Sequence, residues 1–272
     1  MRRTVGSKKA REREYARRRY AKQVVRLNKA HQRRRRNQMV GLITAAALIV
    51  GGVTVGFLAT RPGDSSPAAE PTMPEPIPCT RPTPLELSFD APPSPDVAEG
   101  RKWTGTMDLC QDGSYGSLGE PVVGTLQIEL DGQVAPQAVA SFVFLTQAGF
   151  FDGLTCHRLA ESISVLQCGD PDGTGGGGPG YAFGPIENAP EGDLYPAGTI
   201  AMARVSGDGT SMGSQFFILY ADAKITSDAA GGYTVFGRVT SGLDVVQMIA
   251  AMGTVGAETP AAQVTIQKVE IQ

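Results

Sequence analysis

The most informative stretch of the chain, residues 150–181, reads FFDGLTCHRLAESISVLQCGDPDGTGGGGPGY. Within it, LTCHRLA at 154–160 and SVLQC at 164–168 are short apolar runs separated by a polar turn, so they predict a β-hairpin. The glycines at 173–178 fit the spacing G-x-G-x-x-G, but a proline and a glycine follow them instead of a helix. We therefore interpret this segment as a loop and not as a dinucleotide site.

Six further runs of apolar and β-branched residues continue the strand pattern. They lie at 103–110, 122–130, 198–205, 214–220, 233–239 and 262–271. Two segments have helical periodicity instead: 135–150, with Pro136 in its first turn and Gly149 near its end, and 242–253, which ends at Gly253. Their apolar faces are Val139, Phe142 and Val143, and Val245, Val246, Ile249 and Met252. Many strands with two isolated helices predict a mainly-β fold, a closed barrel or a sandwich whose ends the helices cover.

Charge is distributed unevenly along the chain. Residues 1–38 hold 16 of the 25 Lys and Arg residues and only two of the 27 acids. Residues 39–60, MVGLITAAALIVGGVTVGFLAT, carry no charge and are long enough, at about 1.5 Å per residue, to cross a bilayer core of about 30 Å. Four arginines at 33–36 place the N-terminus in the cytoplasm, so we expect one transmembrane helix with the rest of the chain outside. A cleaved secretory signal is the alternative, although its apolar run is typically only about 7 to 15 residues.

Residues 1–38 have too few apolar side chains for a core, so we expect a cytoplasmic basic tail that sets topology and binds anionic lipid headgroups. The same charge could attract RNA, but no motif supports this, and we expect no nucleic-acid partner. Residues 61–101 follow, with 11 prolines between 61 and 95, which predicts an extended spacer outside the membrane. The folded domain is expected at 102–272.

All four cysteines lie beyond the predicted membrane helix, where disulfides can persist. Cys156 and Cys168 flank the predicted hairpin and could face each other, which leaves Cys79 and Cys110 to tie the spacer to the first strand. Four cysteines allow three pairings, and free buried thiols are the alternative. The chain has only two histidines, too few for a multi-histidine metal site, and we expect neither a metal nor a cofactor.

Three blocks, in this order, resemble the cyclophilins, a family of peptidyl-prolyl isomerases. CHRLAESISVLQCGD followed by GTGGGGPGY is similar to F-H-R-V-x-x-G-F-M-x-Q-G-G-D and G-T-G-x-G-G-x-G-Y. AMARV with GSQFFI is similar to M-A-x-A and G-S-Q-F-F-I, and VFGRV is similar to V-F-G-x-V. The resemblance covers roughly residues 102–272 and implies a closed, eight-stranded antiparallel barrel capped by two helices, here preceded by the transmembrane helix.

Rotation about an X-Pro bond breaks no covalent bond, and its barrier of about 18 to 20 kcal/mol comes from lost amide resonance. A pocket for the proline ring and a hydrogen-bond donor aimed at the prolyl nitrogen lower this barrier. The donor binds the twisted amide more strongly than the planar one, because the nitrogen lone pair appears only as the amide twists. The resemblance assigns Arg158 as the donor, Gln167 as the residue that orients it and the substrate carbonyl, and Phe217 as the pocket floor. His157 belongs to the same motif and is carried over with the catalytic residues, although we favour a hydrogen-bonded structural histidine there. The substrate, an extended or unfolded Pro-containing polypeptide, would contact Ser164, Val165, Ala203, Arg204, Gln215 and Tyr233.

The sequence departs from the family pattern around the proline pocket. One extra residue separates the His-Arg pair from the following Gln, and two extra residues lengthen the loop after the AMAR block. Losing one large apolar wall costs about 1 to 3 kcal/mol of binding, about 10- to 200-fold, so we expect reduced activity and poor binding of cyclosporin. The changed positions are Ser164 for a Phe, Val165 for a Met, Arg204 for an Asn, Asp228 for a Trp and Ala229 for a Leu.

Three functional hypotheses follow. The leading one is a membrane-anchored, extracytoplasmic peptidyl-prolyl cis-trans isomerase of an actinobacterial-like bacterium that assists the folding of exported proteins. The alternative is a catalytically weak peptide-binding module or chaperone with the same fold. A serine hydrolase built on Ser211 in the G-x-S-x-G match at 209–213 is disfavoured, because a strand follows and no histidine lies after residue 157.

Overall fold

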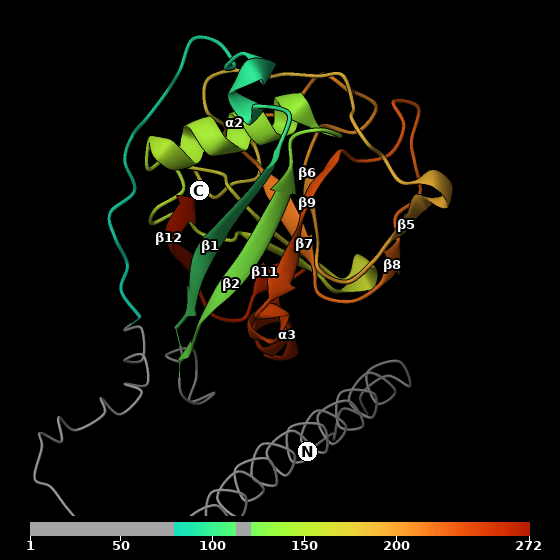
Figure 1. Cartoon of the computed structure of the whole chain (residues 1–272). Coiled ribbons are helices and arrows are strands. Elements are labelled where there is room, and N and C mark those ends of the chain that lie inside the picture. The colour runs from blue at the N-terminus through green and yellow to red at the C-terminus, as the bar shows by residue number, and fades with distance from the viewer. Residues whose placement is uncertain (1–78, 113–120) are drawn as a thin grey trace, which may run out of the picture. The chain divides into compact units, whose positions relative to one another are not determined.

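The computed structural model describes residues 79–112 and 121–272 (Figure 1). The predicted tail, the membrane helix and the first part of the spacer lie outside these ranges. Within them, no helix is long and apolar enough to cross a membrane. The body of the domain is an eight-stranded antiparallel sheet in the order β12-β1-β2-β9-β6-β7-β4-β3, to which each of the eight predicted strand segments contributes one strand.

The sheet strands are β1 (Lys102–Gln111), β2 (Val122–Asp131), β3 (Arg158–Ala160), β4 (Val165–Cys168), β6 (Thr199–Met202), β7 (Phe216–Leu219), β9 (Val235–Ser241) and β12 (Val264–Ile271). Two small pairs accompany the sheet: β5 (Leu194–Tyr195) with β8 (Ala223–Lys224), and β10 (Thr254–Val255) with β11 (Thr259–Pro260). The short 3-10 helices are η1 (Pro95–Ala98), η2 (Glu161–Ile163) and η3 (Glu191–Asp193).

The prediction of a closed barrel was wrong, because β12 and β3 are the edges of the sheet and do not pair as strands. An isolated bridge between Thr155, just before β3, and Thr265 of β12 connects these edges, with a further backbone hydrogen bond from Gly153 N to Ile266 O over 2.8 Å. The three-residue strand β3 bonds elsewhere on this side: Leu159 N donates to Glu258 O, in the turn between β10 and β11, over 2.6 Å. The curled sheet is therefore a half-barrel, in which β3 meets the β10–β11 turn and the residues just before β3 meet β12.

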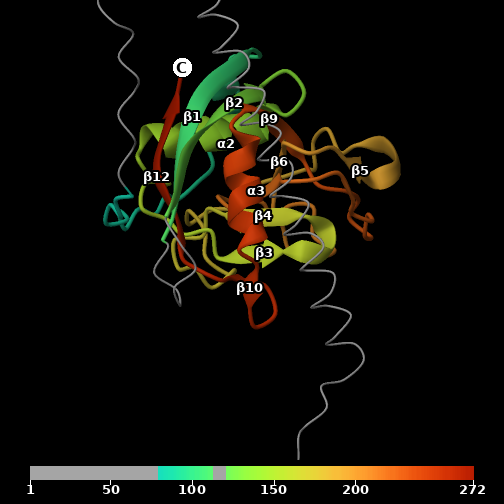
Figure 2. The same ribbon diagram turned by 90° about the horizontal axis from the view of Figure 1, so that it is seen from below.

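Two α-helices, α2 (Pro136–Gln147) and α3 (Leu243–Ala251), lie at opposite ends of the curled sheet, as Figures 1 and 2 show together. Both were predicted. Pro136 begins α2, and Gly149 and Gly253 follow the two helices with φ of +71° and +78°, values that glycine adopts without steric cost. The predicted apolar faces are buried: Val139, Phe142, Val143, Val245, Val246 and Ile249; Met252 is half-buried.

Strand alternation divides the apolar side chains between two clusters. In β7, Phe216 and Ile218 belong to the main core between the sheet and α2, while Phe217 and Leu219 point to the opposite face. The main core contains Phe142, whose ring lies 5.4 Å from that of Phe216. The second cluster consists of Ala160, Val165, Tyr195, Ala201, Phe217, Leu219 and Ile225. This second, smaller cluster is the floor of the site described below.

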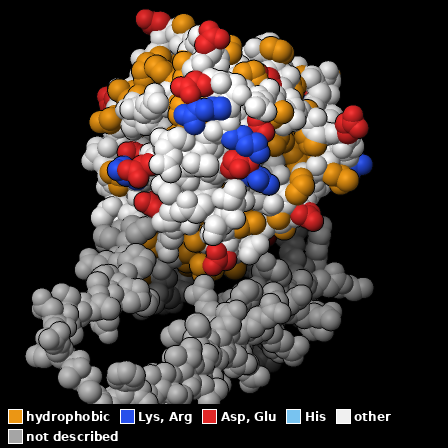
Figure 3. Space-filling model, in the orientation of Figure 1, with side chains coloured by type: hydrophobic (Ala, Val, Ile, Leu, Met, Phe, Trp, Pro, Cys, Tyr) orange, Lys and Arg blue, Asp and Glu red, His pale blue; other side chains and the backbone are white. Residues whose placement is uncertain are grey.

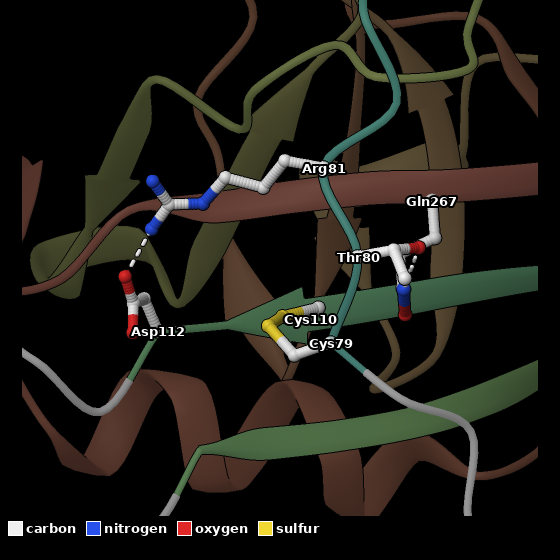
Figure 4. The surroundings of a disulfide bond; sticks show 6 residues. All are labelled: Cys79, Thr80, Arg81, Cys110, Asp112 and Gln267. Carbon is white, nitrogen blue, oxygen red and sulfur yellow. Dashed lines mark hydrogen bonds and ion pairs between the residues drawn. A yellow bond between two sulfur atoms is a disulfide. The ribbon is translucent and has the colours of Figure 1, made fainter.

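Residues 79–101, which the sequence places in the spacer, lie against the domain in this structure. Leu87, Phe89 and Val97 pack on the main core, and η1 packs on α2. The start of this segment is held by the Cys79–Cys110 disulfide, by an ion pair between Arg81 and Asp112, and by a hydrogen bond from Gln267 to Thr80 (Figure 4). Cys156 and Cys168 form the second disulfide, and the two pairings are those that the sequence favoured.

Candidate active site

Four adjacent strands bring the predicted catalytic residues into one row. Arg158 of β3 lies opposite Gln167 of β4, Gln167 lies opposite Phe217 of β7, and Phe217 lies opposite Ala201 of β6. Cross-strand neighbours share a face of the sheet. The row therefore places a guanidinium, an amide and an aromatic ring side by side on the face of the second cluster.

A chain of hydrogen bonds fixes the polar members of this row. Arg158 Nε donates to Glu258 Oε2 over 2.6 Å, and Arg158 Nη1 donates to Gln167 Oε1 over 3.0 Å. Gln167 Nε2 donates to Gln215 Oε1 over 2.8 Å. Gln215 in turn donates to the carbonyls of the glycine-rich loop, at Gly175 (3.0 Å) and Gly177 (2.8 Å). The guanidinium is thus held from both sides while its side chain keeps 38% exposure.

A pocket of about 80 Å³, most of whose lining residues are apolar, lies beside Arg158. Phe217 is 4% exposed and forms its floor, and the ring of Tyr233 meets that of Phe217 edge to face at 5.4 Å. Its lining residues are Arg158, Ile163, Val165, Gln167, Ala203, Arg204, Phe217, Ile225 and Tyr233. The pocket therefore combines apolar side chains with one partly exposed cation, Arg158.

A larger cavity of about 720 Å³ adjoins the row on its other side. The backbone of the glycine-rich loop from Gly175 to Gly180 forms one wall, and the loop that follows Ala203 forms the other. Gln167, Ala203, Arg204 and Gln215 border this cavity, and all but Gln215 also line the smaller pocket. An extended peptide that entered one pocket would thus have a second, more polar space next to it.

Ser164 lines neither of the two pockets, whereas each of the other substrate-contact residues assigned from the resemblance lines at least one of them. It has φ of +56° at the end of η2, and its carbonyl accepts a hydrogen bond from Tyr220 N (3.0 Å). The preceding residue, Ile163, reaches the pocket instead. The one extra residue that the resemblance places between His157 and Gln167 falls in the stretch that contains this turn.

His157 stands next to Arg158 in the chain but lines neither pocket. Both ring nitrogens are buried without a hydrogen-bond partner among the described residues, so the expectation of a hydrogen-bonded histidine was wrong. Gly175 lies next to the ring: a Cβ at this position would be 3.8 Å from His157 Nε2, an ordinary van der Waals contact. Burial lowers the pKa of His157, nearby Asp170 opposes this, and Arg158 adds to it. The neutral ring acts here as packing under the glycine-rich loop.

Sequence analysis missed two residues of the pocket lining and one residue that supports the site. Ile163 and Ile225 supply apolar walls, and Glu258 holds Arg158. Glu258 is 100 residues from its partner in the chain and lies in a polar turn, so no local pattern identifies it. Within the described part of the chain, no group of three or more His, Cys, Asp or Glu side chains could hold a metal ion.

The sequence model of the family described as "Cyclophilin type peptidyl-prolyl cis-trans isomerase/CLD" matches residues 118–271. This chain belongs to that family. It is 38% identical over 213 residues to "Probable peptidyl-prolyl cis-trans isomerase B" of Mycobacterium tuberculosis, covering 71% of this chain and 67% of the relative. It is 43% identical over 121 residues to peptidyl-prolyl cis-trans isomerase B of Bacillus subtilis, covering 44% of this chain and 78% of the relative.

Solved structures agree with this assignment. A cyclophilin type peptidyl-prolyl cis-trans isomerase of Cryptosporidium parvum matches with a TM-score of 0.50 and 25% identity, over 62% of this chain and 98% of the other. The same protein crystallised in the presence of the dipeptide Ala-Pro matches with a TM-score of 0.50 and 26% identity. By homology, therefore, this cyclophilin is a peptidyl-prolyl cis-trans isomerase.

Proposed function

We propose that this cyclophilin accelerates X-Pro rotation in exported polypeptides, with Arg158 donating to the prolyl nitrogen above an apolar pocket. The position of Arg158 carries the proposal. Two of its five N–H donors bond to described residues, Glu258 and Gln167, and the side chain remains partly exposed at the pocket. Arg158 therefore has N–H donors left for a substrate, and the direction of its guanidinium is already fixed by the other two hydrogen bonds.

The chemistry follows from where charge develops. In the planar amide the nitrogen lone pair is delocalised, so a donor beside it gains little. As the bond twists, the lone pair localises on nitrogen and the guanidinium binds it more strongly, which stabilises the transition state over the ground state. Phe217 and Tyr233 hold the ring by apolar contact. Gln167 donates one amide hydrogen to Gln215, which leaves the other for the carbonyl before proline.

The cellular setting is proposed on sequence and covalent grounds. The uncharged run at 39–60, with arginines before it, supports a membrane anchor whose N-terminal tail is cytoplasmic and contacts anionic lipid. The two disulfides support an oxidising compartment for the domain. Protease treatment of intact spheroplasts that express the full chain tests this placement. We expect digestion of the domain from outside, whereas full protection until lysis would contradict it.

A second candidate function, a peptide-binding module with little catalysis, is favoured by one observation. Arg204, a charged side chain, stands in the wall of a pocket of only about 80 Å³. An experiment with an Ala-Pro peptide and the full chain in detergent micelles distinguishes the isomerase from the binding module. We expect NMR exchange spectroscopy to show faster cis/trans exchange with the protein present. Binding without faster exchange would replace the isomerase by the binding module.

A further inference from the structure

Arg204 is the most completely bonded side chain near the pocket. Its side chain is 0% exposed, and its five N–H donors match five acceptors. Nη1 and Nη2 donate to the two carboxylate oxygens of Asp228, over 2.9 and 2.8 Å. The other acceptors are the backbone carbonyls of Gly232 (3.2 Å, from Nε), Gly231 (2.6 Å, from Nη2) and Val205 (3.2 Å, from Nη1).

Asp228 is equally occupied. Besides Arg204, its carboxylate accepts hydrogen bonds from Gly207 N (2.8 Å), Ala230 N (2.9 Å) and Ser206 Oγ (3.2 Å). The hydrogen bonds from Arg204, and after them those from Gly207 N and Ala230 N, hold the pKa of Asp228 far below its ordinary value, so the carboxylate is charged at any physiological pH. The two side chains thus cross-link the loop after β6, residues 203–208, to the turn at residues 228–232.

The cross-link acts on the pocket through Tyr233. The guanidinium carbon of Arg204 lies 4.7 Å from the centre of the Tyr233 ring, and it bonds the two carbonyls immediately before Tyr233 in the chain. On its other side the ring meets Phe217, and Tyr233 N donates to Tyr195 Oη over 2.9 Å. Arg204 therefore sets both the backbone and the ring position of one pocket wall.

We propose that the pair Arg204–Asp228, which we name the clamp, is a positioning device that sets the affinity of the pocket for proline. This rests on the proposed function and extends it to residues that do not act on the amide. Burying an arginine costs desolvation free energy, which is offset only when its donors are bonded. A lysine at position 204 would leave backbone carbonyls unpaired, and a neutral residue at position 228 would leave the charge of Arg204 unpaired. Because all five of its donors are bonded, Arg204 cannot bind the substrate directly without breaking the clamp.

The test uses Arg204→Lys and Asp228→Asn in the full chain, since each keeps size while removing the fork or the charge. The matched control is Arg101, which also pairs with a carboxylate (Glu99, 2.7 Å) and lies over an aromatic ring (Trp103, 3.6 Å), but outside the pocket lining. The control variants are Arg101→Lys and Glu99→Gln. Val246→Ala, on the buried face of α3 in the main core, controls for lost stability alone.

Two readouts separate positioning from general stability. We expect Kd for an Ala-Pro peptide, or KM, to rise about tenfold in both clamp variants, with kcat within about twofold, and no change in the controls. We also expect the ring signals of Tyr233, assigned with Tyr233→Phe in a ¹³C-tyrosine sample, to shift only in the clamp variants. Unchanged Kd and unchanged Tyr233 signals would overturn the proposal. If the parent protein binds the peptide without accelerating its cis/trans exchange, the proposed function is wrong. The Kd values and the Tyr233 signals still test the role of the clamp in that case.

Discussion

Arg158 and Gln167 face each other on neighbouring strands, and the 3.0 Å hydrogen bond between them gives the guanidinium a fixed direction. The pair is rigid because the sheet register sets it and Gln215 anchors the amide from behind. A cation held in this way stabilises a developing lone pair without first having to be reoriented. The predictions below follow from this arrangement and from the groups that support it.

Glu258 should matter for catalysis although it does not line the pocket. We expect Glu258→Gln to lower kcat/KM about threefold to tenfold, because Arg158 loses its charged partner and is less well directed. The assay is X-Pro exchange of a peptide by NMR. Glu99→Gln removes a comparable but more exposed ion pair and should have no effect. Equal or faster exchange in Glu258→Gln would show that the ion pair restrains Arg158 unproductively.

His157 should make the fold sensitive to mild acid. Its folded pKa lies below the ordinary 6.5, so as pH falls below about 6.5 the unfolded chain takes up a proton that the folded chain resists. Stability present above that pH is therefore lost on acidification. We expect the thermal unfolding midpoint to fall more between about pH 7.5 and about pH 5 in the parent than in His157→Gln. Identical pH dependence in the two proteins would contradict this account of the ring.

The Cys79–Cys110 disulfide should stabilise the domain. It closes 31 residues of chain, and loop-closure entropy predicts a loss of about 3 to 4 kcal/mol of unfolding free energy for Cys79→Ser with Cys110→Ser. Urea unfolding of the parent and the double variant measures this loss. The Cys156–Cys168 bridge closes only 12 residues, so its removal should cost less. The opposite ranking would mean that segment 79–101 contributes little to the folded domain.

Cyclosporin should bind weakly. The family's inhibitor contacts include the Trp position that Asp228 occupies by resemblance, and in this structure Asp228 is bonded to Arg204 and does not line the proline pocket. We expect no inhibition of peptide exchange at equimolar drug and protein. A tight one-to-one complex by calorimetry would show that the apolar contacts of Ile225 and Ile163 replace the missing side chain.

The row of Arg158, Gln167 and Phe217 could be predicted because its members lie in short motifs that resemble the family pattern. The structure places the three residues opposite one another on neighbouring strands. The supporting contacts could not: Glu258 is 100 residues from Arg158, and Asp228 is 24 residues from Arg204, distances at which sequence pattern carries no pairing information. The prediction of a closed sheet was wrong for a similar reason, since the pattern of apolar residues in a strand does not specify which backbone groups bond to the outer edge of that strand.

The composition of residues 79–101, the segment before β1, gave no indication that this segment packs on the domain. Its prolines predict an extended chain, and the backbone of 79–94 is indeed without helix or strand. Leu87 and Phe89 nevertheless reach the main core, and Phe89 N donates to Pro179 O over 2.8 Å beside the glycine-rich loop. A few apolar residues in a proline-rich segment were enough to place it on the domain, a contact that periodicity analysis does not detect.

The central claim is that Arg158 stabilises the twisted amide. The most direct measurement is cis/trans exchange of an Ala-Pro peptide with the full chain in detergent micelles, comparing the parent, Arg158→Ala and the control Arg101→Ala. We predict that Arg158→Ala loses about 100-fold in catalysed exchange while it keeps its fold by circular dichroism and the control keeps its rate. Exchange in Arg158→Ala as fast as in the parent would contradict the account.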